Sequence, residues 1–482
     1  MRNQFQNLAL AGILFASAWA AADEPTDSGA LDPTFGVGGK VTIAPSVEAA
    51  GTSITGADLA VQPDGKILVL GHDNSDITFV VRLNANGSVD QTFGGTQEGL
   101  PAGFVGFCCG TPDGIAVRPN GRVVFAFHNA AGSAIYVAQF LADGNIDFSF
   151  GTSAGVSFAQ PAPGDALYGG KMILDADGTI DIAGTYHQQS TNNNQFHFTR
   201  FAADGQSSQT FQFAFGSGNN QDDHALGVAV DRQGRYLVSG YHRGAAGNYD
   251  CAAIRITRDL YDVDRTFNYI DDQDYGSVTL AFDYGGDNFD SCNAVAVQDD
   301  YIILGGNSTK PTTGGTFQAA TLALLDPNGA LVQADCVNIC IPAKFAFGYA
   351  QTNQDAINTV GKLIIDPYNT KYPNVYAIGS GRLGGSPHGP AFGIARMNLP
   401  QNTNFRFDPD FNSGSPLSAY FATRPDGIGL QITSNTAMSG ALSNGKLVAV
   451  GSTQVGSISS IAVLRMAPFD GILRNGFDVP YY

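Results

Sequence analysis

One block recurs along this chain and constrains its fold more than any other feature. Each copy has an alternating apolar run, a turn built on a pair such as Asp-Gly or Asn-Gly, a second and a third run, and a tail rich in Gly, Asp and Phe. The clearest copy spans residues 59–95, and we count seven copies. The first four turns lie 56, 57 and 56 residues apart, at Asp64, Asn120, Asp177 and Gln233.

The runs within each copy are short and β-rich, and most of them end on glycine, as in KILVLG and RYLVSG. Two such runs around an Asp-Gly or Asn-Gly pair predict a tight hairpin, because both residues tolerate positive φ. With a third run and room for a fourth, each copy predicts a four-stranded antiparallel blade. Seven copies without a helical period predict an all-β fold, a seven-bladed β-propeller. We expect the N-terminal run at residues 40–43 to close the ring by completing the last blade.

Three segments, LDPTFGVGGKV, VQPDGKILVLG and RLNANGSVDQTFG, resemble the bacterial delta-60 repeat. The resemblance spans essentially the whole chain after the first 22 residues and is weakest in the fifth and sixth copies. It implies a propeller-like, exported protein and carries over no catalytic residue. The signature Trp of tryptophan–aspartate repeat propellers is missing from every copy.

The first 22 residues have the pattern of a signal peptide. Arg2 gives a basic start, an apolar core follows, and small residues at 18–20 or 20–22 form a cleavage site. The apolar stretch is too short to span a bilayer. We therefore expect export to the periplasm or the extracellular space, a short linker over residues 23–30, and one domain over residues 31–482.

The chain is acidic, with a formal charge of −18 that becomes −19 once Arg2 leaves. Binding to phosphate backbones needs Lys and Arg, so nucleic acid and anionic lipid are not expected partners. The acidity suits solubility outside the cell or the binding of cations. No later stretch is apolar for long enough to predict a membrane span, and we expect a monomer.

Six cysteines after a signal peptide predict disulfides, and six allow fifteen pairings. Cys251 and Cys292 could join neighbouring blades, and Cys336 and Cys340 could close a local ring. Cys108 and Cys109 would form a strained vicinal bridge or stay reduced. No Cys-x-x-Cys pair occurs, which favours structural disulfides over a zinc site.

Histidines gather at equivalent places in the copies. Five follow a second strand, and a sixth, His224, lies in a loop that leads into a first strand, next to Asp222 and Asp223. In a propeller these two kinds of loop share a face, so the pattern predicts one His/Asp-rich ligand face. The five are His72, His128, His187, His242 and His388. The strongest candidates for a site are His224, His187, His242 and Asp223, followed by His128 and His72.

Imidazole and carboxylate together can bind a divalent metal or transfer protons near neutral pH. No cofactor is expected other than such a metal, whose weak candidate ligands are Asp222, Asp223, His224, Asp287 and Asp290. The alternative is that the repeat places similar residues at similar sites, too far apart to act together.

Arginines recur at the end of the third strand, and aspartates recur in the tails. An Arg that bonds to a carboxylate or a backbone carbonyl would pin the tail of its blade, which is an architectural role. The arginines are Arg82, Arg200, Arg255, Arg396 and Arg465, and the aspartates are Asp90, Asp147, Asp264 and Asp410.

Two functional hypotheses lead, and a purely structural or envelope-associated role is a third. The first is an exported, non-enzymatic module that binds a protein, a glycan or a small ligand on its loop face. The second is a propeller enzyme, a metal-assisted hydrolase or lyase that uses the same face. The enzyme needs at least three of the named His and Asp side chains to converge at a pocket.

Overall fold

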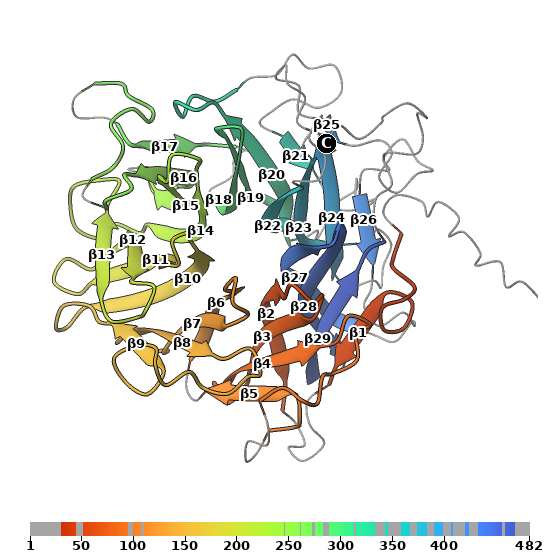
Figure 1. The fold of residues 1–482 in the computed structure, drawn as a ribbon. Helices are drawn as coiled ribbons and strands as arrows, with labels where there is room; N and C mark the ends of the chain where they lie inside the picture. The colour runs from red at the N-terminus through yellow and green to blue at the C-terminus, as the bar shows by residue number, and fades with distance from the viewer. Residues whose placement is uncertain are drawn as a thin grey trace, which may run out of the picture.

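The protein is an all-β propeller whose sheets stand around a common centre (Figure 1). The computed structural model describes residues 30–44, 52–94, 100–107, 110–244, 246–260, 262–271, 275–282, 289–312, 315–332, 343–345, 358–366, 374–382, 390–398, 406–407, 420–423, 432–455 and 458–467. Within these residues no helix is long and apolar enough to cross a membrane.

Four sheets are four-stranded and antiparallel. The first contains β2 (Ile54–Val61), β3 (Ile67–Asp73), β4 (Thr78–Leu83) and β5 (Phe104–Phe107). The second contains β6 (Thr111–Val117), β7 (Val123–His128), β8 (Ile135–Phe140) and β9 (Val156–Ala159). The third contains β10 (Ala166–Leu174), β11 (Ile180–Gln188), β12 (Asn193–Phe201) and β13 (Ser208–Phe213). The fourth contains β27 (Ile432–Ser443), β28 (Lys446–Val455), β29 (Ile458–Arg465) and β1 (Lys40–Ile43).

Two sheets are larger. A five-stranded sheet contains β22 (Thr359–Asp366), β23 (Asn374–Arg382), β24 (Pro390–Asn398), β25 (Arg406–Phe407) and β26 (Tyr420–Thr423). An eight-stranded sheet contains β14 (His224–Val230), β15 (Tyr236–Arg243), β16 (Tyr249–Ile256), β17 (Ser277–Leu280), β18 (Phe289–Gln298), β19 (Tyr301–Thr312), β20 (Gly315–Leu325) and β21 (Ala343–Phe345).

The prediction of seven separate four-stranded blades is therefore wrong. The described strands form five separate blades of four or five strands and one continuous eight-stranded sheet. The long sheet arises because Tyr249 of β16 pairs in parallel with Phe289 of β18. Counting repeats cannot reveal such a pair, because it depends on how two repeats approach each other in space.

The disulfide between Cys251 and Cys292 is confirmed, and it joins the same two strands, β16 and β18. Both cysteines are fully buried. The pairing of Cys336 with Cys340 and the state of Cys108 and Cys109 lie outside the described residues.

The N-terminal strand completes the last blade, as expected. β1 pairs antiparallel with β29, with Lys40 opposite Leu464 and Ile43 opposite Ile461. Figure 1 shows β1, from the start of the chain, beside β29, from its end. The sheet formed by β27, β28, β29 and β1 packs in turn against β2, so the first and last blades meet.

The hairpin turns follow the repeat, but not all in one geometry. At Asn444 and Gly445 both residues have positive φ, 49° and 74°, as a type I′ turn requires. At Asp64 and Gly65 only the glycine does, at 82°, and the Asp64 carboxylate accepts the backbone N–H of Lys66. The turn sequence thus predicted the hairpins, and the exact turn type varied.

The hydrophobic core lies between neighbouring sheets. Val69 and Val81 of the first blade pack with Val450 and Ile461 of the last blade in one buried cluster. Similar clusters fill the other gaps, because a blade covers its two faces only by stacking on its neighbours.

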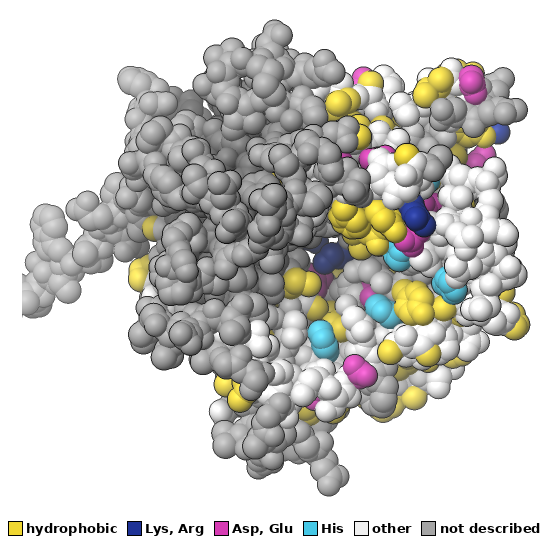
Figure 2. Space-filling model, turned by 180° about the vertical axis from the view of Figure 1, so that it is seen from behind, with side chains coloured by type: hydrophobic (Ala, Val, Ile, Leu, Met, Phe, Trp, Pro, Cys, Tyr) yellow, Lys and Arg dark blue, Asp and Glu magenta, His cyan; other side chains and the backbone are white. Residues whose placement is uncertain are grey.

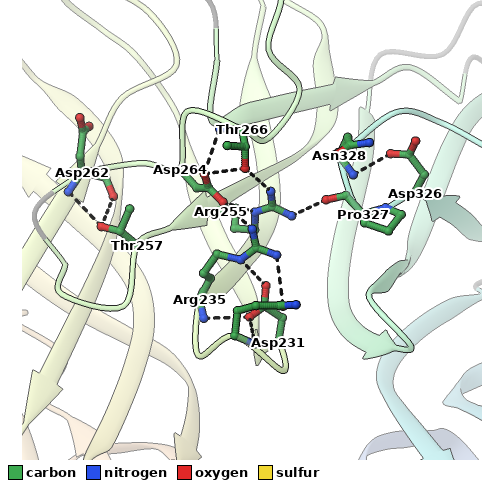
Figure 3. Close-up of polar contacts among 11 residues, drawn as sticks. Asp231, Arg235, Arg255, Thr257, Asp262, Asp264, Thr266, Asp326, Pro327 and Asn328 are labelled. Carbon is green, nitrogen blue, oxygen red and sulfur yellow. Dashed lines mark hydrogen bonds and ion pairs between the residues drawn. The ribbon is translucent and has the colours of Figure 1, made fainter.

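Arg82, Arg255 and Arg465 hold both the tail of their own sheet and the next repeat, whereas Arg200 bonds to Asp181 of β11 and to the carbonyl of Arg258. Figure 3 shows Arg255, whose Nε donates to Asp264 at 2.8 Å and whose Nη1 donates to the carbonyl of Pro327 at 2.6 Å. Arg82 does the same with Asp90 and the carbonyl of Ala142. The guanidinium groups of Arg82 and Arg255 also lie over tail phenylalanines, Phe93 at 4.5 Å and Phe267 at 4.7 Å.

In the second copy, other residues hold the tail in place. Gln139 replaces the arginine there, and its amide donates to Asp147. Arg118 bonds to Gln139 and reaches the carbonyls of Gly178 and Ala203 in the next blade. The tail therefore stays pinned, which supports an architectural role for this set of residues.

Candidate functional site

The face formed by the loops before the first strands and after the second strands carries several histidines. Figure 2 shows histidine side chains gathered on one side of this view, among acidic and hydrophobic side chains. The structure describes five histidines near this face, and their surroundings differ. They are His72, His128, His187, His224 and His242. His388 and Asp287 lie outside the described residues.

The richest group surrounds His224, at the start of β14. The Oδ1 atom of Asp222 accepts bonds from His224 Nε2 at 2.8 Å and from Asn194 Nδ2 at 2.7 Å. Its Oδ2 atom accepts the hydroxyl of Tyr249 at 2.7 Å. The Nδ1 atom of His187 lies 2.9 Å from Asn194 Oδ1. We call His187, Asn194, Asp222, His224 and Tyr249 the His224 cluster.

Aromatic rings support this cluster on one side. The ring of His224 stacks on Tyr241 with centroids 4.8 Å apart. Tyr241 and Tyr249 both pack against Phe289, at 5.0 and 5.3 Å. These residues are half-buried, so the site combines polar groups with partly exposed aromatic side chains.

The charge state of the cluster follows from its contacts. Burial opposes ionisation of Asp222, but bonds from Asn194, Tyr249 and His224 outweigh it and hold the pKa of Asp222 below its usual value. Burial and the Asp222 charge raise the pKa of Tyr241 to about 12. The bond to Asp222, together with burial, raises the pKa of Tyr249. At neutral pH the cluster thus holds one ionised carboxylate between neutral phenols.

The tautomers of the two histidines also follow from the network. The Nδ2 atom of Asn194 donates to Asp222, so its Oδ1 atom accepts from His187 Nδ1. A neutral His187 then presents Nε2 as an acceptor. In the neutral tautomer of His224 whose Nε2 atom donates to Asp222, Nδ1 accepts the hydroxyl of Thr185 at 3.1 Å.

Asp223 belongs to a separate pair. Asp222 and Asp223 precede β14, and Asp222 bonds to His224 whereas Asp223 has other partners. Asp223 is fully buried and bonds to His242 Nδ1 at 2.7 Å and to the backbone N–H of Phe215 at 3.1 Å. The ring of His242 stacks on Phe215.

A third pair lies at the end of β7. The Nδ1 atom of His128 is 2.7 Å from Asp113 Oδ1, and the other carboxylate oxygen of Asp113 is buried without a hydrogen-bond partner among the described residues. Burial raises the pKa of Asp113 despite the bond to His128. Burial lowers the pKa of His128, but Asp113 more than offsets this, so the net pKa of His128 is raised.

His72 stands apart from these pairs. Burial lowers its pKa against the charges of Asp73 and Asp76, and its Nδ1 atom has no hydrogen-bond partner among the described residues. Asp290, another metal candidate, is buried and accepts the backbone N–H of Phe282.

The structure therefore joins His187 and His224 and separates them from His242 with Asp223, from His128 and from His72. In the part of the chain that the structure describes, no group of three or more His, Cys, Asp and Glu side chains could hold a metal ion. Asn194, Tyr241, Tyr249 and Phe289 were not predicted from the sequence. Tyr241 and Tyr249 lie beside His242 at the ends of β15 and β16, so their spacing could have indicated them.

A family profile supports the propeller fold. The sequence profile of the family described as "Domain of unknown function (DUF5122) beta-propeller" matches residues 62–93. No curated protein matches the chain.

Several solved structures are similar at low identity. An α-L-arabinofuranosidase from Fusarium graminearum, bound to an iminosugar inhibitor, is 11% identical over 75% of this chain and 93% of its own, with a TM-score of 0.42. A sialidase from Trypanosoma rangeli is 9% identical over 81% and 58%, with a TM-score of 0.39. The Nup133 β-propeller domain of Vanderwaltozyma polyspora is 10% identical over 88% and 97%, with a TM-score of 0.40. We infer no activity from these likenesses.

Proposed function

We propose that this protein is an exported, non-enzymatic binding module that takes a glycan at the His224 cluster. The observation that carries the proposal is the placement of Tyr241, Tyr249 and Phe289 beside the polar network of Asp222, Asn194 and His187. Sugars offer apolar C–H faces that pack on aromatic rings and hydroxyl groups that bond to fixed polar atoms.

Binding fits the cluster better than catalysis does. A general acid or base has to exchange a proton with a substrate. Both oxygens of Asp222 accept bonds from neighbouring side chains, and Asp223 is buried against His242 and Phe215. The network holds its members in place and leaves His187 Nε2 as a polar contact for a ligand.

Glycan binding is tested by titration calorimetry with a panel of neutral and acidic oligosaccharides. We expect one class to bind the wild type and to bind His224→Ala and Tyr249→Ala at least about tenfold more weakly, a loss of about 1.4 kcal/mol. His242→Ala is the matched control, because its pair with Asp223 is separate, and it should bind as the wild type does. Equal affinity in all four proteins would refute this location for the site.

The enzyme alternative has its own measurements. Chromatography of the oligosaccharides after incubation would show cleavage products if the protein were a hydrolase or lyase. Elemental analysis of protein purified without chelator would show whether a divalent metal is present in stoichiometric amount. If cleavage products or bound metal are found with the wild type and are lost in His224→Ala, the protein is an enzyme and the proposal of a binding module is wrong.

Export is tested on the mature protein. Trp19 is the only tryptophan of the chain, so cleavage after Ala20 or after Ala22 removes it. We expect protein recovered from the periplasm or the medium to have its N-terminus at one of these sites and to show tyrosine emission only. A tryptophan emission band in that material would exclude both cleavage sites.

A further inference from the structure

A cavity of about 210 Å³ lies among β10, β14, β18 and β22. These strands contact one another in that order around the centre of the ring. Backbone and apolar side chains such as Met172, Val228 and Leu363 form most of the wall. The charged side chains in the wall are Lys171 and Lys362, and the described residues that line it include no Asp or Glu.

The two lysines hold equivalent places in their strands. A register shift lies between Gly169 and Lys171 in β10, and another lies between Val360 and Lys362 in β22. A β-bulge re-aims the side chain that follows it. Both lysines are therefore directed to the same cavity from different repeats.

The charge of Lys362 affects the pKa of Lys171. Burial lowers the pKa of Lys171, the charge of Lys362 lowers it further, and the charges of Asp58 and Asp113 oppose both effects. Two like charges beside a partly buried, largely apolar wall are unfavourable unless a counter-charge compensates them.

Asp58 and Asp113 lie close enough for their charges to act on Lys171, and each has hydrogen-bond partners of its own. Asp58 accepts the hydroxyl of Ser439 and the backbone N–H of Ile115. Asp113 bonds to His128. In the described part of the chain, no ion pair joins either lysine to a carboxylate within 4.0 Å.

We propose that this cavity binds a small oxyanion, a phosphate or a carboxylate, between the ammonium groups of Lys171 and Lys362. The size of the cavity suits such an ion, and its cationic wall contrasts with a chain whose formal charge is −18. Two ammonium groups supply the charge-assisted hydrogen bonds that oxyanions prefer.

This site is distinct from the His224 cluster. His224 begins β14, whereas Gly227 of the same strand lines the cavity. Three residues of strand span about 10 Å. The anion site would therefore lie deeper along the ring axis than the proposed glycan site, and either could exist without the other. Figure 2 shows a basic side chain near the centre of the histidine-bearing face.

The experiment compares inorganic phosphate and malonate with sodium chloride at equal ionic strength, by calorimetry and thermal unfolding. We expect phosphate or malonate to bind the wild type and to raise its melting temperature more than chloride does. Lys171→Met and Lys362→Met should each weaken binding at least about tenfold, and the double variant should abolish it. Arg232→Met, which removes an exposed cation, should bind as the wild type does.

Three results would overturn the proposal. One is the absence of anion binding by the wild type. Another is an equal rise of the melting temperature in the wild type and the double variant, which is a general salt effect. The third is binding that appears only in Asp58→Asn, which would mean that Asp58 already neutralises the lysines. If the methionine variants fail to fold, Lys171→Arg and Lys362→Arg keep the charge and should retain binding.

Discussion

At the scale of single residues, the recurring arginine has two roles in three of the copies that carry it. Arg82, Arg255 and Arg465 each bond to a tail aspartate and to a carbonyl in the adjoining repeat. A buried guanidinium with several acceptors is costly to remove, because its partners stay buried without it. The residues that recur most strictly therefore serve the architecture.

Arg82→Ala tests this role. We expect a loss of about 3 kcal/mol in the free energy of unfolding, because Asp90 and the carbonyl of Ala142 lose a buried partner. Denaturant unfolding measures the loss, and oligosaccharide affinity should stay unchanged. Arg232→Ala, an exposed cation, is the control and should change stability by less than about 0.5 kcal/mol. A variant with weaker ligand binding and normal stability would contradict the architectural role.

His197 makes stability depend on pH. It is buried on β12, its Nε2 atom donates to the carbonyl of Tyr168 at 2.9 Å, and burial lowers its pKa to about 4. As the pH falls, His197 takes up a proton near pH 6.5 in the unfolded chain but only near pH 4 in the folded protein. The free energy of unfolding therefore falls as the pH drops from about 6.5 towards 4.

We expect this residue to contribute up to about 3 kcal/mol to that fall. His197→Gln keeps a hydrogen-bond donor and does not titrate, so its stability should change less over the same pH range. Urea unfolding at steps between pH 4 and pH 7 measures both curves. Parallel curves for the wild type and His197→Gln would show that His197 does not cause the dependence.

At the scale of elements, the repeats are not equivalent. β16 and β18 are joined by one parallel bridge and by the disulfide between Cys251 and Cys292, which turns two repeats into one sheet. The same strands bring Tyr249 and Phe289 together beside the His224 cluster. The join between repeats therefore positions part of the candidate site.

The disulfide should stabilise this join. It closes a segment of 41 residues, for which the loss of chain entropy in the unfolded state corresponds to about 4 kcal/mol. We expect the double variant Cys251→Ala, Cys292→Ala to melt at a lower temperature than the wild type. Reductant should lower the melting temperature of the wild type more than that of the variant. An unchanged melting temperature in the double variant would contradict the estimate.

At the scale of the whole molecule, closure of the ring depends on the N-terminal segment. β1 pairs with β29, and Asp32 accepts bonds from Arg465 and Lys446 of the last blade. Burial opposes ionisation of Asp32, but those bonds and the hydroxyl and amide of Thr34 hold its pKa well below its usual value. This contact links positions more than 400 residues apart.

Truncation tests the closure. A chain that starts at residue 45 lacks β1 and Asp32, and we expect it to unfold at a lower temperature and to be digested faster by protease at the last blade. A chain that starts at residue 30 keeps both and is the matched control. Equal melting temperatures of the two truncated chains would show that β1 does not hold the ring closed.

The sequence predicted those parts of the fold that follow from local pattern. The hairpins, the Arg82 and Arg255 contacts with their tail aspartates, the outer position of β1 and one disulfide are all confirmed. The number of separate blades was wrong, because the pair of Tyr249 with Phe289 merges two repeats. For the site, the sequence indicated the histidines and Asp222 but not Asn194, which links His187 to Asp222.

By itself, then, the sequence determined the repeating strand pattern, because turn residues and alternating apolar runs act within a few residues of one another. Only the tertiary structure decided which repeats merge, which histidines meet and that Lys171 and Lys362 share a cavity. These features depend on contacts between repeats, set by bulges and by the angle at which neighbouring sheets pack. A repeat specifies its own blade, whereas a site between blades exists only once the ring has closed.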